Sequence, residues 1–155
     1  MSAIIRVGTE KDIPHALELV RELAIFEKAP DEVEVTINEM ANWGFGKEKI
    51  FDFFVLEKEN TMIGIALYYY KYSTWKGKCL FLEDIIVTEP ERNNGYGKLL
   101  FNEVVKVAKA QHVRRMEWQV LEWNTPAIEF YKNYQSHLDG EWINCKLTYE
   151  QIKVL

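Results

Sequence analysis

The chain alternates between segments with a helical repeat of apolar residues and segments with a strand-like repeat, separated by short polar turns. Residues 12–26 carry apolar side chains every three or four positions, which predicts an amphipathic helix that Thr9 can cap. Thr36 and Glu39 stand at the spacing of a capping box and predict a second, short helix that ends near Gly44. Two helices are therefore expected before the main run of strands.

Strand-like segments, rich in β-branched and aromatic residues, occupy residues 4–7, 51–57, 62–72, 78–87, 114–120 and 142–147. Short turns join the second, third and fourth of these segments, so we expect them to form an antiparallel meander. A helical run at residues 98–110 predicts a βαβ crossover to the next strand, and a last helix is expected to begin near Pro126. The sequence thus predicts a single domain over residues 1–155 of the α/β (α+β) class, with a mixed, mostly antiparallel central sheet flanked by helices.

Composition and charge narrow the function classes. The 155 residues are 48% hydrophobic, which is enough for one domain with a sizeable core. The net charge of −5 argues against a nucleic-acid surface and agrees with attraction of a small cation. No stretch reaches the ~20 apolar residues of a membrane span, and residues 1–6 lack the apolar run of a signal peptide, so we expect a cytoplasmic protein without a membrane partner. Cys79 and Cys145 lack C-x-x-C spacing and are expected to be packed thiols, and no metal site is predicted.

A glycine-containing turn, Arg92-Asn93-Asn94-Gly95-Tyr96-Gly97, lies between a predicted strand and a predicted helix. Glycine can present backbone N–H groups in conformations closed to other residues, and the helix that follows adds its positive dipole end, so the turn is suited to hold a pyrophosphate. Arg92 adds a positive charge beside these donors. A Walker loop is excluded because it requires Ser or Thr where Leu99 stands, and a G-x-G-x-x-G loop is excluded because Leu100 replaces its last glycine.

The R-x-x-G-x-G turn in this context resembles the coenzyme A loop of the GNAT superfamily of N-acetyltransferases. Further segments resemble, in order, the diamine acetyltransferase family, which includes the spermidine/spermine and thialysine enzymes: Glu22–Lys28, Gly44–Gly46, Tyr72–Gly77, Leu82–Ile85, Trp123–Asn124 and Phe130–Lys132. The resemblance implies a GNAT-like domain that transfers the acetyl group of acetyl-CoA to a small primary amine, and it implies a homodimer. Ser73 stands where the polyamine branch typically has Asp, which favours thialysine or a related lysine-like amine or diamine over spermine.

Acetyl transfer to an amine requires two proton movements, because the amine must lose a proton before it attacks and the departing thiolate is helped by an acid. By resemblance, Glu83 is the base and Tyr131 is the acid that protonates the sulfur. Strand alternation predicts that Asp84 lies on one face of its strand with Leu80 and Leu82, while Glu83 lies on the other.

The resemblance also implies binding residues. The acceptor pocket is expected to be lined by Phe26, Glu27, Trp75, Glu83 and Asp84. Acetyl-CoA is expected to bind the backbone of Ile85 and Val87 along its pantetheine arm and, elsewhere, Arg92, Asn94, Gly95, Tyr96, Gly97, Lys98, Asn124, Tyr131 and Lys132. Gln135 replaces a glycine found in many relatives, so the exit from the last helix can differ locally. Two alternatives remain open: acetylation of a protein or peptide amine, and a non-catalytic coenzyme A-binding sensor.

Overall fold

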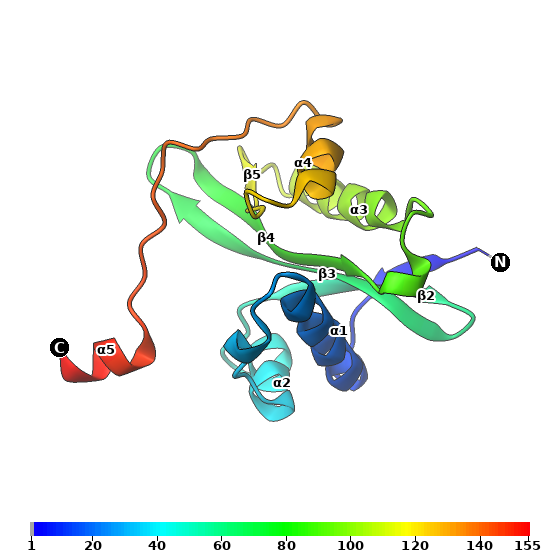
Figure 1. The fold of residues 1–155 in the computed structure, drawn as a ribbon, viewed down its shortest axis with the longest axis horizontal. Coiled ribbons are helices and arrows are strands. Elements are labelled where there is room, and N and C mark those ends of the chain that lie inside the picture. Colours follow the sequence, from blue (N-terminus) through cyan, green and yellow to red (C-terminus); the bar gives the residue numbers. More distant parts are fainter. Residues whose placement is uncertain (1) are drawn as a thin grey trace. The chain divides into compact units, whose positions relative to one another are not determined.

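The computed structural model describes residues 2–155, which form two compact units, one ending at Gln119 and the other spanning Val120–Leu155. The first unit contains five strands and three α-helices in the order β1 (Ile4–Val7), α1 (Ile13–Phe26), α2 (Ile37–Phe45), β2 (Asp52–Lys58), β3 (Thr61–Ser73), β4 (Gly77–Val87), α3 (Tyr96–Ala110) and β5 (Met116–Glu117) (Figure 1). Short 3-10 turns are formed by Glu10–Asp12, Pro30–Glu32 and Glu89–Glu91. The second unit contains α4 (Thr125–Lys132) and α5 (Tyr149–Val154).

The sheet has the strand order β1-β2-β3-β4-β5. The first four strands are antiparallel to their neighbours, whereas β5 runs parallel to β4 after the crossover through α3. Both Glu59 and Asn60, at the turn between β2 and β3, have positive φ, as a tight hairpin turn requires. The expected mixed, mostly antiparallel sheet flanked by helices is therefore confirmed.

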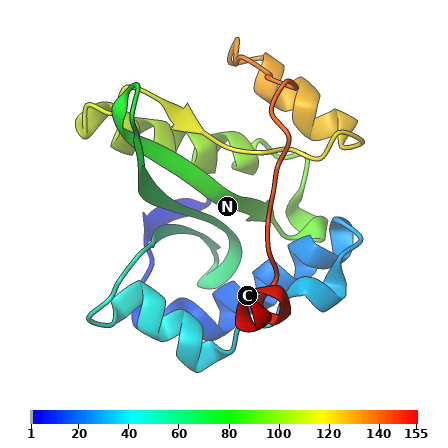
Figure 2. The ribbon, with the colours of Figure 1, turned by 90° about the vertical axis from the view of Figure 1, so that its left-hand side faces the viewer.

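Helices cover both faces of this sheet, with α1 and α2 on one face and α3 on the other (Figures 1 and 2). Leu17 of α1 and Met40 of α2 pack with Val55, Ile65 and other apolar side chains that the strands direct to that face. Burying a large aliphatic side chain contributes about 1.5–3 kcal/mol, so this two-layer contact holds the acid-bearing strand β4 in place.

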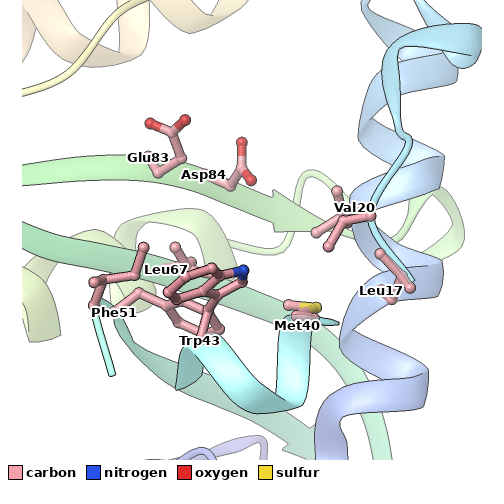
Figure 3. Close-up of a pocket in the computed structure, with 10 residues that line it drawn as sticks. Leu17, Val20, Met40, Trp43, Phe51, Leu67, Glu83 and Asp84 are labelled. Carbon is pink, nitrogen blue, oxygen red and sulfur yellow. The ribbon is translucent and has the colours of Figure 1, made fainter. Parts of the chain in front are cut away.

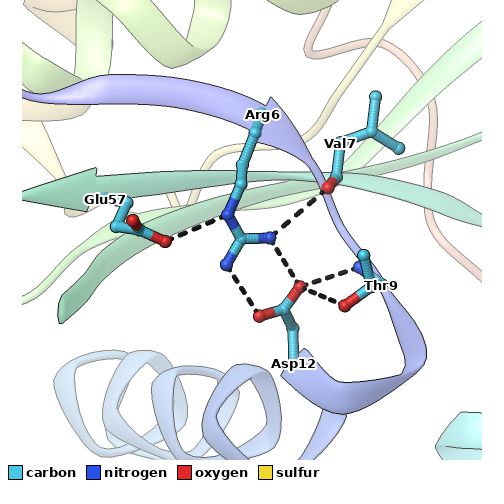
Figure 4. A network of polar contacts seen from close by, with 5 residues as sticks. All are labelled: Arg6, Val7, Thr9, Asp12 and Glu57. Carbon is cyan, nitrogen blue, oxygen red and sulfur yellow. Dashed lines mark hydrogen bonds and ion pairs between the residues drawn. The ribbon is translucent and has the colours of Figure 1, made fainter. Parts of the chain in front are cut away.

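A network of charged side chains joins β1 and β2 to the start of α1 (Figure 4). The guanidinium of Arg6 donates to both carboxylate oxygens of Asp12, at 2.7 and 2.9 Å, and to Glu57 at 3.0 Å. Asp12 in turn accepts the backbone N–H of Thr9 at 2.7 Å, so the expected cap lies one turn ahead of α1. The hydrogen bond from Arg6 lowers the pKa of Asp12 to about 2. The predicted capping box of Thr36 and Glu39 is confirmed, with contacts of 2.8 and 3.2 Å.

The C-terminal part differs from the sequence prediction. Residues 142–147 form no strand, so the prediction of a last strand was wrong, and Thr148 instead caps the unpredicted helix α5. The segment has the β-branched and aromatic composition of a strand, but strand formation also requires a partner strand, which composition does not report. Cys145 in this segment is exposed rather than packed, whereas Cys79 in β4 is buried as expected. The strand expected at residues 114–120 shrinks to Met116–Glu117.

Candidate active site

A β-bulge in β4 brings two adjacent acids to one face of the sheet. Leu67 of β3 lies opposite Asp84, and the next residue, Tyr68, lies opposite Leu82, so Glu83 has no residue opposite it. The extra residue shifts the side-chain alternation of β4 by one position. Asp84 therefore shares the face of Leu67, α1 and α2, and the expectation that it points the same way as Leu82 was wrong.

Three carboxylates gather where β4 faces α1. Burial, followed by the negative charges of Glu83 and Glu27, raises the pKa of Asp84 to about 7. Burial also raises the pKa of Glu27, which directly follows the last residue of α1. Within residues 2–155, no ion pair joins any of the three acids to a lysine or arginine. A cation placed beside these groups would favour their ionised forms, so the cluster attracts positive charge.

Glu83 has a neutral hydrogen-bond partner. The hydroxyl of Tyr69 donates to Oε2 of Glu83 at 3.3 Å, and the Tyr69 ring packs on Phe81 with ring centres 5.4 Å apart. Burial, together with the charge of Glu83, raises the pKa of Tyr69 to about 12, so the phenol stays protonated and can donate near neutral pH. Tyr69 thus restrains the rotamer of the acid that the resemblance assigns as the base.

The two acids also line a pocket of about 220 Å³ (Figure 3). The remaining lining residues are apolar and come from α1, α2, β3 and the segments that precede α2 and β2: Leu17, Val20, Val35, Met40, Trp43, Ile50, Phe51 and Leu67. Figure 3 shows Glu83 and Asp84 side by side on β4, with both carboxylates extending in the same direction. The site therefore combines an acidic rim with an apolar wall that the sequence did not indicate.

The other expected acceptor residues are placed differently. Phe26, the last residue of α1, lies under the guanidinium of Arg92, 5.1 Å from its ring centre. Trp75 lies in the turn between β3 and β4 and is 77% exposed, and its backbone N–H donates to Oγ of Ser73 at 3.2 Å. Neither aromatic residue lines the pocket that contains the two acids of β4. The structure thus brings Glu27, Glu83 and Asp84 together but does not bring Trp75 to them.

The glycine-containing turn has a left-handed backbone immediately before α3. Gly95 precedes α3 with φ of 78°, and Asn93 has φ of 65°, both in the left-handed region. The side chain of Asn94 donates to the carbonyl of Glu91 at 3.1 Å, which stabilises the turn. Apart from their chain neighbours and the adjacent backbone of α3, no heavy atom lies within 4 Å of a Cβ built on Gly95 or Gly97, so the start of α3 is open to a small group.

Arg92 is held by protein groups rather than standing free beside the turn. Its Nε donates to the carbonyl of Val87 at 2.8 Å, and its Nη2 lies 3.6 Å from Oε1 of Glu22 on α1. Glu22 also accepts hydrogen bonds from Thr88 and Glu89. Sequence reasoning assigned no role to Glu22 or Tyr69, because each acts through a partner distant in the sequence.

Three expected residues lie in the second unit. Asn124 caps α4, accepting the backbone N–H of Ala127 at 3.4 Å. Tyr131 is buried in the last turn of α4, with its ring 5.2 Å from that of Phe130. Lys132 forms an ion pair with Glu129 at 3.2 Å. Gln135, at the place of the relatives' glycine, has φ of 56°, which explains why glycine suits that position.

Comparison with known proteins agrees with this architecture. Residues 16–134 match the acetyltransferase (GNAT) family. A thialysine N-epsilon-acetyltransferase of Sus scrofa is 34% identical over 139 residues, which cover 84% of this chain and 82% of the relative. An L-ornithine N5-acetyltransferase of Arabidopsis thaliana is 35% identical over 105 residues, covering 66% of this chain and 46% of that protein.

Solved structures share the fold at low sequence identity. An integron cassette protein from V. cholerae superposes with a TM-score of 0.80 at 18% identity and covers 99% of this chain and 97% of its own. A metagenomic aminoglycoside acetyltransferase gives a TM-score of 0.77 at 16% identity, covering 94% of this chain and 95% of its own. No helix within residues 2–155 combines the length and apolar character needed to cross a membrane. The match over residues 16–134, together with the extent of the identity to named acetyltransferases, shows that the chain belongs to the GNAT family of N-acetyltransferases.

Proposed function

We propose that the protein transfers the acetyl group of acetyl-CoA to a small primary amine. The observation that carries this proposal is the cluster of Glu27, Glu83 and Asp84, which has no ion-pair partner in the described chain and lies beside an apolar pocket. A protonated amine is the cation that an acetyltransferase must bind, and its carbon chain suits the apolar wall.

In the proposed reaction, Glu83 accepts the proton of the bound ammonium, directly or through water, and Tyr69 holds that carboxylate in place. The amine nitrogen then attacks the thioester carbon, forming the C–N bond as the C–S bond breaks, and the nitrogen releases its second proton to solvent to give the neutral amide. Tyr131 donates its proton to the departing thiolate sulfur. Asp84, whose pKa of about 7 lies near the working pH, supplies a second carboxyl that gains negative charge when the ammonium arrives.

For acetyl-CoA, the proposed donors are the backbone N–H groups from Asn94 to Lys98 and the backbone of Ile85 and Val87. Asn124, Tyr131 and Lys132 are proposed to contribute from the second unit. The left-handed Gly95 and the open space around Gly97 support the part of this proposal that concerns the pyrophosphate.

The proposed acceptor is thialysine or another lysine-like amine or diamine. Relatives that are 34% and 35% identical are named for thialysine and for ornithine. A human relative is named a spermidine/spermine N(1)-acetyltransferase-like protein, and the match covers 19% of its length. Ser73 supports an acceptor shorter than spermine, because its hydroxyl carries no charge to bind a second ammonium group. This hydroxyl also already accepts a hydrogen bond from the guanidinium of Arg115 at 3.0 Å. We further propose a cytoplasmic homodimer to which the apolar residues 142–155 contribute.

The test is a turnover screen in which purified protein and acetyl-CoA are mixed with lysine analogues, diamines, polyamines, aminoglycosides and short peptides, and release of the coenzyme A thiol is measured. We expect thialysine-like amines to give the highest kcat/KM. Turnover confined to peptides would replace the small-amine acceptor with a protein acceptor. Binding of coenzyme A without turnover of any amine would contradict the proposed function.

A further inference from the structure

One acidic side chain of α1 contacts the cosubstrate side of the sheet instead of the amine pocket. Glu22 accepts the hydroxyl of Thr88 at 3.0 and 3.2 Å and the backbone N–H of Glu89 at 2.9 Å. Its Oε1 also lies 3.6 Å from Nη2 of Arg92. One carboxylate thus fixes the chain at three positions between the end of β4 and the glycine-containing turn.

Arg92 links these contacts to both expected binding regions. Its guanidinium holds the carbonyl of Val87, the last residue of β4, at 2.8 Å, and it stacks on Phe26, one turn after Glu22 on α1. The residue that follows Phe26 is Glu27, a member of the acid cluster. A displacement of Arg92 would therefore change the positions of Phe26 at the end of α1 and of the first residues of the glycine-containing turn.

We propose that Glu22 is a positioning residue that couples the amine site to the acetyl-CoA site by holding Thr88 and Arg92 against the end of α1. The inference rests on the proposed function for the identity of the two ligands. In this proposal Glu22 contacts neither ligand. It changes the affinity of each site for its ligand when the other site is occupied.

The direction in which Glu22→Gln changes coenzyme A affinity distinguishes a positioning role of Glu22 from a purely electrostatic one. Glu22 is negative and lies close to Arg92, so a purely electrostatic role would repel the phosphates of coenzyme A, and Glu22→Gln would then tighten binding. Positioning predicts the opposite, because glutamine loses the charged acceptor that holds Thr88 and Arg92. Since charge-assisted hydrogen bonds are individually strong, we expect coenzyme A affinity to fall about 10-fold in Glu22→Gln.

The experiment measures coenzyme A binding by calorimetry, with and without saturating amine, and then the KM of each substrate. Glu22→Gln is expected to weaken coenzyme A binding and to reduce the factor by which the amine changes it, while the thermal midpoint stays close to that of the parent protein. Glu22→Asp keeps the charge but withdraws the carboxylate by one methylene, so it should show the same defect. Thr88→Val, which removes only the hydroxyl donor, should weaken binding in the same direction by a smaller factor.

Glu18→Gln is the matched control, because Glu18 is exposed one turn earlier on α1 and the same charge is removed. The double variant Glu22→Gln with Thr88→Val should bind coenzyme A little more weakly than Glu22→Gln alone, because the hydroxyl of Thr88 acts through its hydrogen bond to Glu22. Additive losses, or a Glu22→Gln protein that binds coenzyme A as tightly as the parent, would overturn the inference. Failure of the parent protein itself to bind coenzyme A would instead count against the proposed function.

Discussion

Replacing Asp84 with asparagine should stabilise the protein in a way that depends on pH. Burial and neighbouring acids raise the pKa of Asp84 from its ordinary 3.8 to about 7. A raised carboxyl pKa means that the folded state prefers the neutral acid, so the stability that this preference provides is complete below pH 3.8 and is lost as pH rises through 7. Asparagine stays neutral throughout, so its advantage over the parent should grow with pH.

The size of the effect follows from the two pKa values. The interval from 3.8 to about 7, at about 1.4 kcal/mol for each pH unit, corresponds to about 4 kcal/mol between acidic and mildly alkaline solution. This is an upper limit, because Asp84 is only partly buried and water screens its charge. Even half of this value is a substantial fraction of the roughly 5–15 kcal/mol by which a small domain is usually stable.

The assay is urea unfolding of the parent and Asp84→Asn proteins at pH 4.5, 6, 7 and 8. The free-energy advantage of the variant should increase by about 1.5–3 kcal/mol over this range. Asp52→Asn is a suitable control, because Asp52 is a partly exposed acid of the same sheet that pairs with Lys49 at 2.6 Å. An advantage of Asp84→Asn that is the same at pH 4.5 and pH 8 would refute the reasoning.

Four further expectations concern the reaction, the phosphate turn, the charged network and assembly. Glu83→Gln should lower turnover roughly 10²–10⁴-fold near neutral pH, with partial recovery at higher pH, and wild-type rates from pH 6 to 9 would exclude Glu83 as the base. Tyr131→Phe should lower turnover while acetyl-CoA affinity stays nearly intact. Gly97→Val should fold normally but weaken coenzyme A binding in calorimetry, because the open space above the backbone is filled, and Gly95→Val adds strain at φ of 78°. Asp12→Asn should cost about 1–2 kcal/mol in urea unfolding at pH 7, a difference that disappears as pH falls from 3.8 towards 2, where Asp12 becomes protonated. Light scattering at micromolar concentration should give a dimer, and truncation before residue 142 should shift it towards monomer.

Much of the fold could be predicted from local sequence signals. The repeat in residues 12–26, the capping box at Thr36 and the short turns between strands each specify an element through neighbouring residues. The strand predicted at 142–147 failed because pairing depends on a distant partner, and α5 was missed although Thr148 and Gln151 form a capping box. The local sequence pattern predicts a helix or turn well when the residues within that element determine its conformation.

The candidate site was predictable to a smaller extent. The glycines of the turn from Arg92 to Gly97 predict a left-handed backbone before a helix, and Gly95 has φ of 78° immediately before α3. Anion binding by this turn stays a prediction. The bulge at Glu83 could not be read from β4, because it is a property of the register between two strands. The hydrogen bond between Thr88 and Glu22 joins residues 66 positions apart, and that between Tyr69 and Glu83 joins residues 14 positions apart, so no short sequence motif predicts them.

The bulge in β4 also divides the pairing of this strand with β3 into two segments. Gly77–Leu82 is held between β3 and β5, whereas Asp84–Val87 continues towards the turn that precedes α3. An interrupted ladder is a point where amide protons exchange with solvent at a lower free-energy cost than global unfolding. Glu83 lies at this interruption, so we expect its amide proton to exchange faster than those of the paired residues on either side of it in β4.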